Sequence, residues 1–214
     1  MRFNFAIVGG GLTATAMLHQ FVNRVQALAD TGQLDPSEIG IQVYERQDTF
    51  GPGFPHNARM TLPFHITNMC ASDMGVLAGY PADFDDWVVR NSARLQKRFS
   101  YFRESLAELS GSRVNCNHYP RAIMGEYLKA RFQETAASAR IAGLDLSLYP
   151  STEVIDLQFH QNKIRLQVTD LSSGTRQFHN ADRLLLATGH WSEQTAEDRY
   201  FTSPWPARKL QRAI

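Results

Sequence analysis

The glycine-rich stretch at residues 9–14 has the residue types and spacing that hold a pyrophosphate. With its spacers, the motif consists of Gly9, Gly10, Gly11, Leu12, Thr13 and Ala14. Gly9 permits a tight turn, Gly11 lets phosphates approach the backbone, and the small Ala14 lets a helix pack closely on a strand. The free N–H groups at the start of that helix attract an anion. The motif therefore predicts dinucleotide binding, and an ordinary tight strand–helix turn is the alternative.

The elements on either side of the motif favour the dinucleotide interpretation. The apolar run 3–8 predicts a strand, and apolar residues at helical spacing predict a helix from 12 to about 29. Residues 40–46 predict a second strand with an acid, Glu45, near its carboxyl end. A carboxylate there accepts hydrogen bonds from ribose hydroxyls and repels a 2′-phosphate, so FAD or NAD fits better than NADP. A solvated strand-end glutamate is the alternative, since Glu45 lies further from Gly11 than the usual distance of about 20 residues.

The middle of the sequence predicts an irregular segment followed by helices. Residues 49–78 are rich in glycine, proline and asparagine, which is typical of either a functional loop or a surface excursion. A helix is predicted to begin at 81–87, with acids in its first turn. Its predicted buried side consists of Phe84, Trp87 and Val88. Residues 92–110 predict a solvated helical face rather than a surface for an acidic partner, and residues 122–139 predict a long helix.

Short strands dominate the sequence after residue 143. Four runs separated by turn residues predict an antiparallel β-meander: 144–149, 153–160, 163–170 and 175–179. A continuous apolar run at 181–187 then predicts a central strand buried on both faces. It leads into Ala187-Thr188-Gly189, small residues that let a cofactor approach the carboxyl end of a parallel sheet, where open α/β sheets bind ligands.

Charge and composition argue against several classes of function. The 214 residues carry 22 basic and 21 acidic side chains, a net charge of +1, which argues against a nucleic-acid partner. No apolar run approaches the length of a membrane span and no signal peptide precedes the first strand, so we expect a cytoplasmic protein without a membrane partner. Cys70 and Cys116 are then predicted to be reduced, partly buried thiols. The seven histidines lack zinc-hydrolase spacing, and no metal site is expected.

Taken in order along the chain, these motifs resemble the FAD-binding domain of flavoproteins with two dinucleotide-binding domains. That group includes glutathione-reductase-like enzymes and flavin monooxygenases. The resemblance covers about residues 3–192 and rests on residues 9–14, Glu45-Arg46, the meander and Ala187-Thr188-Gly189. More narrowly, the chain is similar to bacterial FAD-NAD(P)-binding proteins of poorly defined function. The features shared with that branch are Gly51-Pro52-Gly53-Phe54-Pro55, Leu62-Pro63-Phe64-His65-Ile66-Thr67-Asn68-Met69, Pro120-Arg121 and Gly125-Glu126-Tyr127-Leu128.

The resemblance implies an α/β fold built around a Rossmann-like FAD-binding domain at residues 1–192. This domain would contain a parallel central sheet, a helical and loop insertion at about 49–118, and an antiparallel β-meander at about 144–180. Residues 193–214 would be a linker or a frayed tail.

The resemblance also implies a role for each motif position. The FAD pyrophosphate would lie at Gly9 to Thr13, and the adenosine ribose at Glu45 with Arg46 adjacent. The remaining contacts would come from the backbone of Val154 to the adenine, from Ala187, Thr188 and Gly189 closing over the cofactor, and from Asn68 and Met69 towards the isoalloxazine.

The expected function is that of a FAD-dependent oxidoreductase or monooxygenase-like flavoprotein with NAD(P)H as reductant. Related proteins carry a second glycine motif for NAD(P)H, which this sequence lacks, so we expect either a fragment or a short relative whose partner domain or subunit supplies that site. The alternatives are a non-catalytic FAD- or nucleotide-binding module acting with a partner, and a NAD-dependent dehydrogenase. No catalytic residue is identified: His65, His190 and Arg121 are candidates by location only.

Overall fold

The computed structural model describes residues 2–100, 116–160 and 162–189 of the chain. The chain divides into two compact units, a first unit of residues 1–53 and 129–189 and a second unit of residues 54–128 and 190–214. Helix α6 (Arg121–Ile141) contributes residues to both units. The predicted tail at 193–214 lies outside the described residues.

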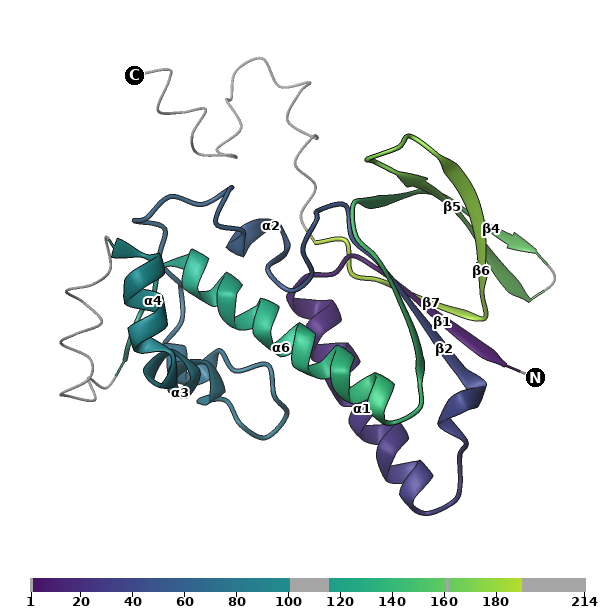
Figure 1. The fold of residues 1–214 in the computed structure, drawn as a ribbon, viewed down its shortest axis with the longest axis horizontal. Helices are drawn as coiled ribbons and strands as arrows, with labels where there is room; N and C mark the ends of the chain where they lie inside the picture. The colour runs from purple at the N-terminus through teal and green to yellow at the C-terminus, as the bar shows by residue number, and fades with distance from the viewer. Residues whose placement is uncertain (1, 101–115, 161, 190–214) are drawn as a thin grey trace. The chain divides into compact units, whose positions relative to one another are not determined.

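A parallel four-stranded sheet forms the centre of the first unit. Its strands, in spatial order, are β3 (Asp145–Tyr149), β2 (Ile39–Tyr44), β1 (Phe3–Val8) and β7 (Arg183–Leu186). Each neighbouring pair is parallel, and Figure 1 shows β1, β2 and β7 side by side. Helix α1 (Leu12–Asp30) and the short helix η1 (Pro36–Glu38) connect β1 to β2. The predicted β–α–β unit is therefore confirmed.

The two faces of strand β1 are buried in different cores, which explains its continuous apolar sequence. Phe5 and Ile7 point into a cluster with apolar residues of α1 and with Phe132 of α6. Ala6 and Val8 point into a second cluster that includes residues from strand β5 (Lys163–Asp170). Because successive side chains of a strand alternate between faces, an apolar residue is needed at each of the buried positions 5–8.

The antiparallel sheet of the first unit contains three of the four strands predicted for the meander. These are β4 (Thr152–His160), β5 (Lys163–Asp170) and β6 (Arg176–Ala181), in that order. The assignment of residues 144–149 to the meander is wrong, because β3 pairs in parallel with β2. The reason is the preceding helix: a chain that returns to a sheet through a helix enters it in the same direction as before.

The prediction that the run at 181–187 forms a central strand buried on both faces is also wrong. Among the described residues, β7 pairs only with β1 and lies at the edge of the sheet. Leu186 is 59% exposed, and no residue of β7 is fully buried. An apolar run shows that its side chains favour burial, but it does not determine how many strands pair with it.

The second unit is helical and has an aromatic core. Among its described residues, the helices are α2 (Gly53–His56), which starts at the unit boundary, η2 (Ala71–Asp73), α3 (Asp83–Arg90), α4 (Ser92–Arg98) and the first two turns of α6. Phe84 and Trp87 of α3 pack against Tyr127 of α6, and Val88 is also buried, as predicted. The Tyr127 hydroxyl donates to Asp83 and accepts from the Val76 N–H, so this buried phenol is satisfied on both sides.

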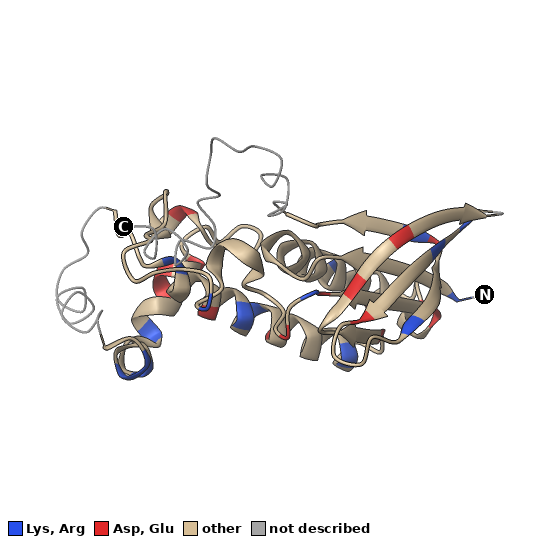
Figure 2. Ribbon diagram, turned by 90° about the horizontal axis from the view of Figure 1, so that it is seen from above, with Lys and Arg blue, Asp and Glu red and all other residues tan. Residues whose placement is uncertain are grey.

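Short elements and mixed charge characterise the remaining described chain. Residues 49–78 contain only α2 and η2, in agreement with the predicted irregular segment, and residues 101–115 of the predicted insertion lie outside the described part. Acidic and basic residues are interspersed along the ribbon (Figure 2).

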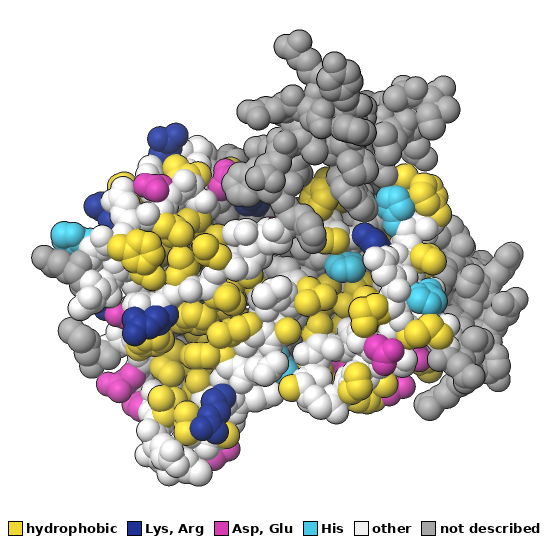
Figure 3. All heavy atoms as spheres, turned by 180° about the vertical axis from the view of Figure 1, so that it is seen from behind, with side chains coloured by type: hydrophobic (Ala, Val, Ile, Leu, Met, Phe, Trp, Pro, Cys, Tyr) yellow, Lys and Arg dark blue, Asp and Glu magenta, His cyan; other side chains and the backbone are white. Residues whose placement is uncertain are grey.

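Hydrophobic side chains also reach one face of the molecule (Figure 3), and Phe159 and Phe178 are among the exposed apolar residues. Among the described residues, no helix is long and apolar enough to cross a membrane.

Candidate functional site

The turn between β1 and α1 requires a glycine at position 9. Gly9 has a φ of +100°, a region that favours glycine. Its N–H donates to the Tyr44 carbonyl at 2.8 Å, which joins the turn to the end of β2. A Cβ atom at this position would lie 2.2 Å from the carbonyl oxygen of Ala187. A larger residue would therefore force apart the ends of two strands.

The next two glycines also lie against neighbouring groups. A Cβ atom at Gly10 would lie 2.6 Å from the ring of Phe50, and one at Gly11 would lie 3.3 Å from the Cα of Gly53. The Gly10 carbonyl accepts from the N–H of Gly51 at 2.7 Å. Gly11 is the N-cap of α1 and has no side chain with which to cap the first N–H groups of the helix. These donors and the positive end of the helix dipole suit an anionic ligand.

The side chain of Glu45 is directed at the glycine turn. Its Oε2 accepts from the Gly10 N–H at 2.7 Å and its Oε1 accepts from the Gln47 N–H at 2.9 Å. Backbone bonds to Tyr149 and Thr152 fix the residue between β3 and β4, and it is only 7% exposed. A carboxylate has about four lone-pair sites, so two bonds from N–H groups leave capacity for further donors. The structure thus brings together two motifs that are far apart in the sequence.

The other predicted positions of the first unit lie on adjoining strand ends. Arg46 pairs with Glu153 of β4 at 3.2 Å, and both side chains are at least partly exposed. Val154 is half-buried in the same strand, next to an irregularity in its pairing with β5. Ala187 donates its N–H to the Val8 carbonyl at 2.8 Å, and Gly189 has a φ of +66°. Parallel strands end at one edge of a sheet, and Arg46, Ala187 and Gly189 accordingly follow the ends of β2 and β7, whereas Val154 lies near the start of β4.

Asn68 and Met69 belong to the second unit, and their predicted position towards the isoalloxazine stays a prediction. Both side chains are exposed. The Asn68 amide oxygen accepts from Nη2 of Arg121 at 3.0 Å, and the Ile66 carbonyl accepts from Nε of the same guanidinium at 3.1 Å. An arginine at the start of α6 opposes the helix dipole, and these two oxygens give it local partners.

Two histidines of the second unit, His56 and His65, have surroundings that lower the pKa of the ring. His65 Nδ1 accepts from the Leu62 N–H, and burial and then the charge of Arg121 lower the pKa of its ring. The pKa of His56 falls to about 4, chiefly through burial and also through Arg121. His56 Nδ1 is buried with no hydrogen-bond partner. Sequence reasoning missed His56, because nothing in the surrounding Gly51-Pro52-Gly53-Phe54-Pro55 indicates that Nδ1 of this half-buried ring is enclosed. His190, the third candidate, lies outside the described residues.

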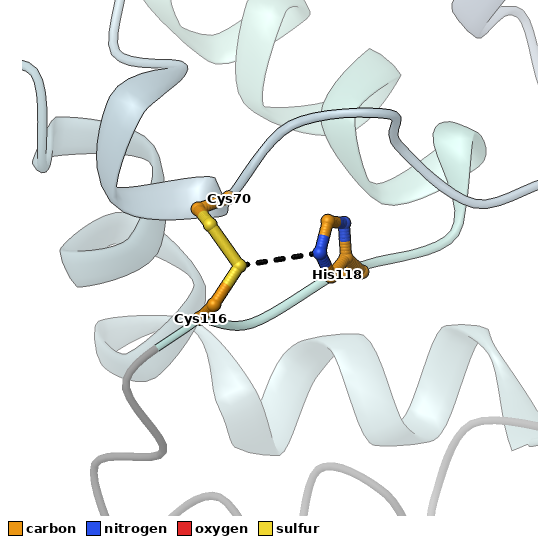
Figure 4. Close-up of side chains that lie close together, drawn as sticks. All are labelled: Cys70, Cys116 and His118. Carbon is orange, nitrogen blue, oxygen red and sulfur yellow. Dashed lines mark hydrogen bonds between the residues drawn. A yellow bond between two sulfur atoms is a disulfide. The ribbon is translucent and has the colours of Figure 1, made fainter.

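The two cysteines form a disulfide, so the prediction of two reduced thiols is wrong. Cys70 and Cys116 are 46 residues apart in sequence, and their Cα atoms lie 5.0 Å apart. Figure 4 shows the bond with the ring of His118 beside it. The prediction failed because it was drawn from the absence of a secretory signal, whereas pairing depends on whether the fold brings the two residues together.

Comparison with known proteins identifies relatives of this chain. A sequence model of the FAD-NAD(P)-binding family matches residues 6–191. The chain is 25% identical over 203 residues to the uncharacterised protein YdhS of Escherichia coli (strain K12), covering 94% of this chain and 33% of YdhS. The fold is similar to the crystal structure of Tmm from Pelagibacter sp. strain HTCC7211, with a TM-score of 0.54 and 16% identity over 88% of this chain and 36% of Tmm.

A further similar structure is that of DfoA, a cadaverine monooxygenase of Erwinia amylovora solved with FAD bound. Its TM-score is 0.45, with 12% identity over 88% of this chain and 35% of DfoA. The chain thus spans about a third of the length of each of these three proteins.

Proposed function

Because the chain belongs to the FAD-NAD(P)-binding family, we propose that the glycine turn and Glu45 of its first unit bind FAD. The observation that carries this proposal is the hydrogen bond from the Gly10 N–H to the Glu45 carboxylate. It joins the pyrophosphate motif to the ribose-binding acid in one small region. A solvated strand-end glutamate, the alternative considered from sequence, would not be 7% exposed.

The residues present fit the cofactor by shape and by chemistry. Side chains are excluded at Gly9, Gly10 and Gly11, since a Cβ atom at each would meet a neighbour within 3.3 Å, so the turn presents bare backbone to a ligand. The uncapped N–H groups at Leu12 and Thr13 provide donors for the pyrophosphate, and Ala14 is fully buried against the sheet. Glu45 would accept from the ribose hydroxyls, with Arg46 at the rim.

The remaining contacts that we propose come from strand ends in the first unit and from the second unit. The Val154 backbone would meet the adenine, and Ala187, Thr188 and Gly189 would line the edge of the site. Asn68 and Met69 would face the isoalloxazine. When bound, FAD supplies hydride or oxygen chemistry, while the chain's own residues hold and orient it.

We further propose that the complete protein is a cytoplasmic oxidoreductase of the monooxygenase-like kind, reduced by NAD(P)H. The chain spans about a third of its relatives, so a partner domain or subunit would supply the NAD(P)H site. The acid at position 45 favours an unphosphorylated ribose at this first site, which agrees with FAD.

The proposal is tested by the visible absorption spectrum of the purified protein and by identification of the cofactor that it releases. We expect FAD at close to one per chain, and Glu45→Gln should reduce FAD retention by at least about 10-fold. The matched control is Glu38→Gln, which changes an exposed glutamate just before the same strand, β2. Circular dichroism would check that both variants fold.

A wild-type protein that is colourless and takes up no added FAD would overturn the proposal. Release of NAD in place of FAD would favour the dehydrogenase alternative. If the protein carries FAD but neither NADH nor NADPH reduces it, the chain by itself is a flavin-binding module whose reduction depends on another domain or subunit.

A further inference from the structure

The disulfide of the second unit lies beside a histidine whose ring is fixed by the backbone. Cys116 Sγ lies 3.2 Å from Nε2 of His118. Nδ1 of the same ring lies 3.0 Å from the Thr67 carbonyl oxygen. A carbonyl oxygen can only accept, so Nδ1 carries the hydrogen, and in the neutral ring Nε2 presents its lone pair to the sulfur. The arrangement places a nitrogen ligand beside two sulfurs.

These three side chains come from two segments that the backbone holds together without help from the disulfide. Segments 65–71 and 116–121 run antiparallel, with a bridge between Ile66 and Pro120. Three backbone bonds join them: Thr67 N–H to Tyr119 carbonyl, Ala71 N–H to Asn117 carbonyl, and Arg121 N–H to His65 carbonyl. None of these bonds involves the disulfide, so opening it removes none of them directly, and the paired segments still carry the sulfurs and the ring side by side.

We propose that Cys70, Cys116 and His118 form a redox-gated binding site for a thiophilic divalent cation, with Zn²⁺ as the best match. Their ligand atoms all lie within 4.8 Å of one another. Zinc takes thiolate sulfur at about 2.3 Å and imidazole nitrogen at about 2.0–2.1 Å, so tetrahedral ligand atoms lie about 3.5–3.8 Å apart. Once the S–S bond is open, the two cysteine side chains would rotate to reach that spacing.

The hydrogen bond from His118 to Thr67 is of the kind that accompanies zinc ligation. Histidines that bind zinc usually donate their second ring N–H to a carboxylate or a backbone carbonyl, which fixes the tautomer and the ring orientation. His118 does this with Nδ1, and Nε2 is the atom that faces the sulfurs (Figure 4). The ring is exposed and the cysteines are half-buried, so a cation can reach the site from solvent. Water would take the fourth position.

The disulfide and the metal site are mutually exclusive states of the same atoms. A dithiol reductant opens the site: one of its thiolates attacks a protein sulfur and breaks the S–S bond, and its second thiol resolves the mixed disulfide. The protein gains two electrons and two protons as two thiols, and the reductant leaves as its own disulfide. Binding of Zn²⁺ then displaces both thiol protons to solvent. This site departs from the sequence-based expectation that the chain has no metal site.

The test compares Zn²⁺ binding by the oxidised and the reduced full chain. The protein is reduced with a phosphine, freed of reductant under nitrogen, and titrated with Zn²⁺ in competition with a chromophoric chelator. We expect one Zn²⁺ per reduced chain and none at this site in the oxidised chain. Co²⁺ should give a near-ultraviolet thiolate charge-transfer band with the reduced chain. A reduced chain that binds no tighter than the Cys70→Ser, Cys116→Ser double variant would overturn the proposal.

Two further measurements isolate the contribution of the histidine and allow for unfolding. His118→Ala should weaken binding by the reduced chain at least about 10-fold, whereas His19→Ala, on helix α1 of the first unit, should leave it unchanged. Equal affinity of His118→Ala and wild type would refute the ligand assignment. If reduction partly unfolds the second unit, Zn²⁺ should restore the helical circular dichroism of wild type and not that of His118→Ala. Failure to restore it would refute the site.

Discussion

The glycine turn of the first unit is a site made of main-chain atoms, whereas the Cys70, Cys116 and His118 cluster of the second unit is made of side-chain atoms. The turn is a main-chain structure, held by bonds such as Gly9 N–H to Tyr44 carbonyl, and its neighbours leave no room for a side chain. In the cluster, the ligand atoms belong to side chains, and backbone bonds such as Thr67 N–H to Tyr119 carbonyl hold together the two segments that bear them.

This difference determines how each region responds to change. A main-chain site has one acceptable residue at each position, so a substitution damages the fold and the site together. A side-chain cluster on paired segments can lose its chemistry while the segments stay together. The four predictions that follow, in order of decreasing effect, test that contrast.

The largest effect is expected from Gly9→Ala. The new Cβ would combine an unfavourable backbone conformation with a collision against the Ala187 carbonyl, and the free energy of unfolding should fall by about 5 kcal/mol. Gly32→Ala is the matched control, since its φ is +68° and no atom lies within 4 Å of the added Cβ, and it should cost about 1 kcal/mol. Urea unfolding measures both values. Equal losses would show that backbone conformation, rather than crowding, makes position 9 a glycine.

Reduction of the disulfide should destabilise the second unit by about 4 kcal/mol. The bond joins residues 46 positions apart, and opening it restores the corresponding loop entropy to the unfolded chain. Hydrogen exchange would localise the effect: amides of α3 and α4 should exchange faster, and those of β1 and β2 should not change. Faster exchange throughout both units would contradict the independence of the two regions.

Acidification should also act through the second unit, with a loss of up to about 3 kcal/mol between pH 6.5 and pH 4. The pKa of His56 is about 4 in the folded chain and near 6.5 when exposed, so the unfolded state binds more protons in this window and stability falls with pH. His56→Phe should flatten the dependence of unfolding free energy on pH. The residual slope would come from His65 and His179, whose pKa values are also lowered by burial. An unchanged slope would mean that His56 is not buried.

The smallest effect is expected from Tyr127→Phe, at about 2 kcal/mol. This change keeps the packing of the ring with Phe84 and Trp87 but removes the hydrogen bond to the Val76 N–H and the one to the buried Asp83 carboxylate, which retains its ion pair with Arg90. Differential scanning calorimetry measures the loss. Retention of FAD should not change, because the first unit is untouched, and a fall in bound FAD would contradict the division between the regions.

The parts of the molecule that were predicted correctly are those where the local residue types allow only one backbone structure. Strand β1 and helix α1 were predicted almost to their ends, because a turn between them demanded glycines and their apolar spacing was strict. The position of Glu45 at the carboxyl end of the second strand was likewise predicted, and the structure adds its hydrogen bond to the Gly10 N–H.

The errors arose where a residue's partner, rather than its own type, decides the outcome. Residues 144–149 form a strand as predicted, yet their pairing depends on the helix before them and on the exposed edge of β2. The edge position of β7 and the pairing of Cys70 with Cys116 have the same origin, since both depend on segments far away in sequence. Local spacing carries no information about such contacts.

The pairing of β1 with β7 has a consequence for the order in which the chain acquires its structure during synthesis. Phe5 pairs with Arg183 and Val8 with Leu186, so this edge of β1 stays unpaired until residues near the end of the described chain have been synthesised. The described residues of the second unit, up to 128, emerge in the interval. Contacts this distant in sequence form slowly, and an unpaired strand edge is prone to aggregate, so a chaperone that shields the nascent β1 would protect this protein until β7 is made.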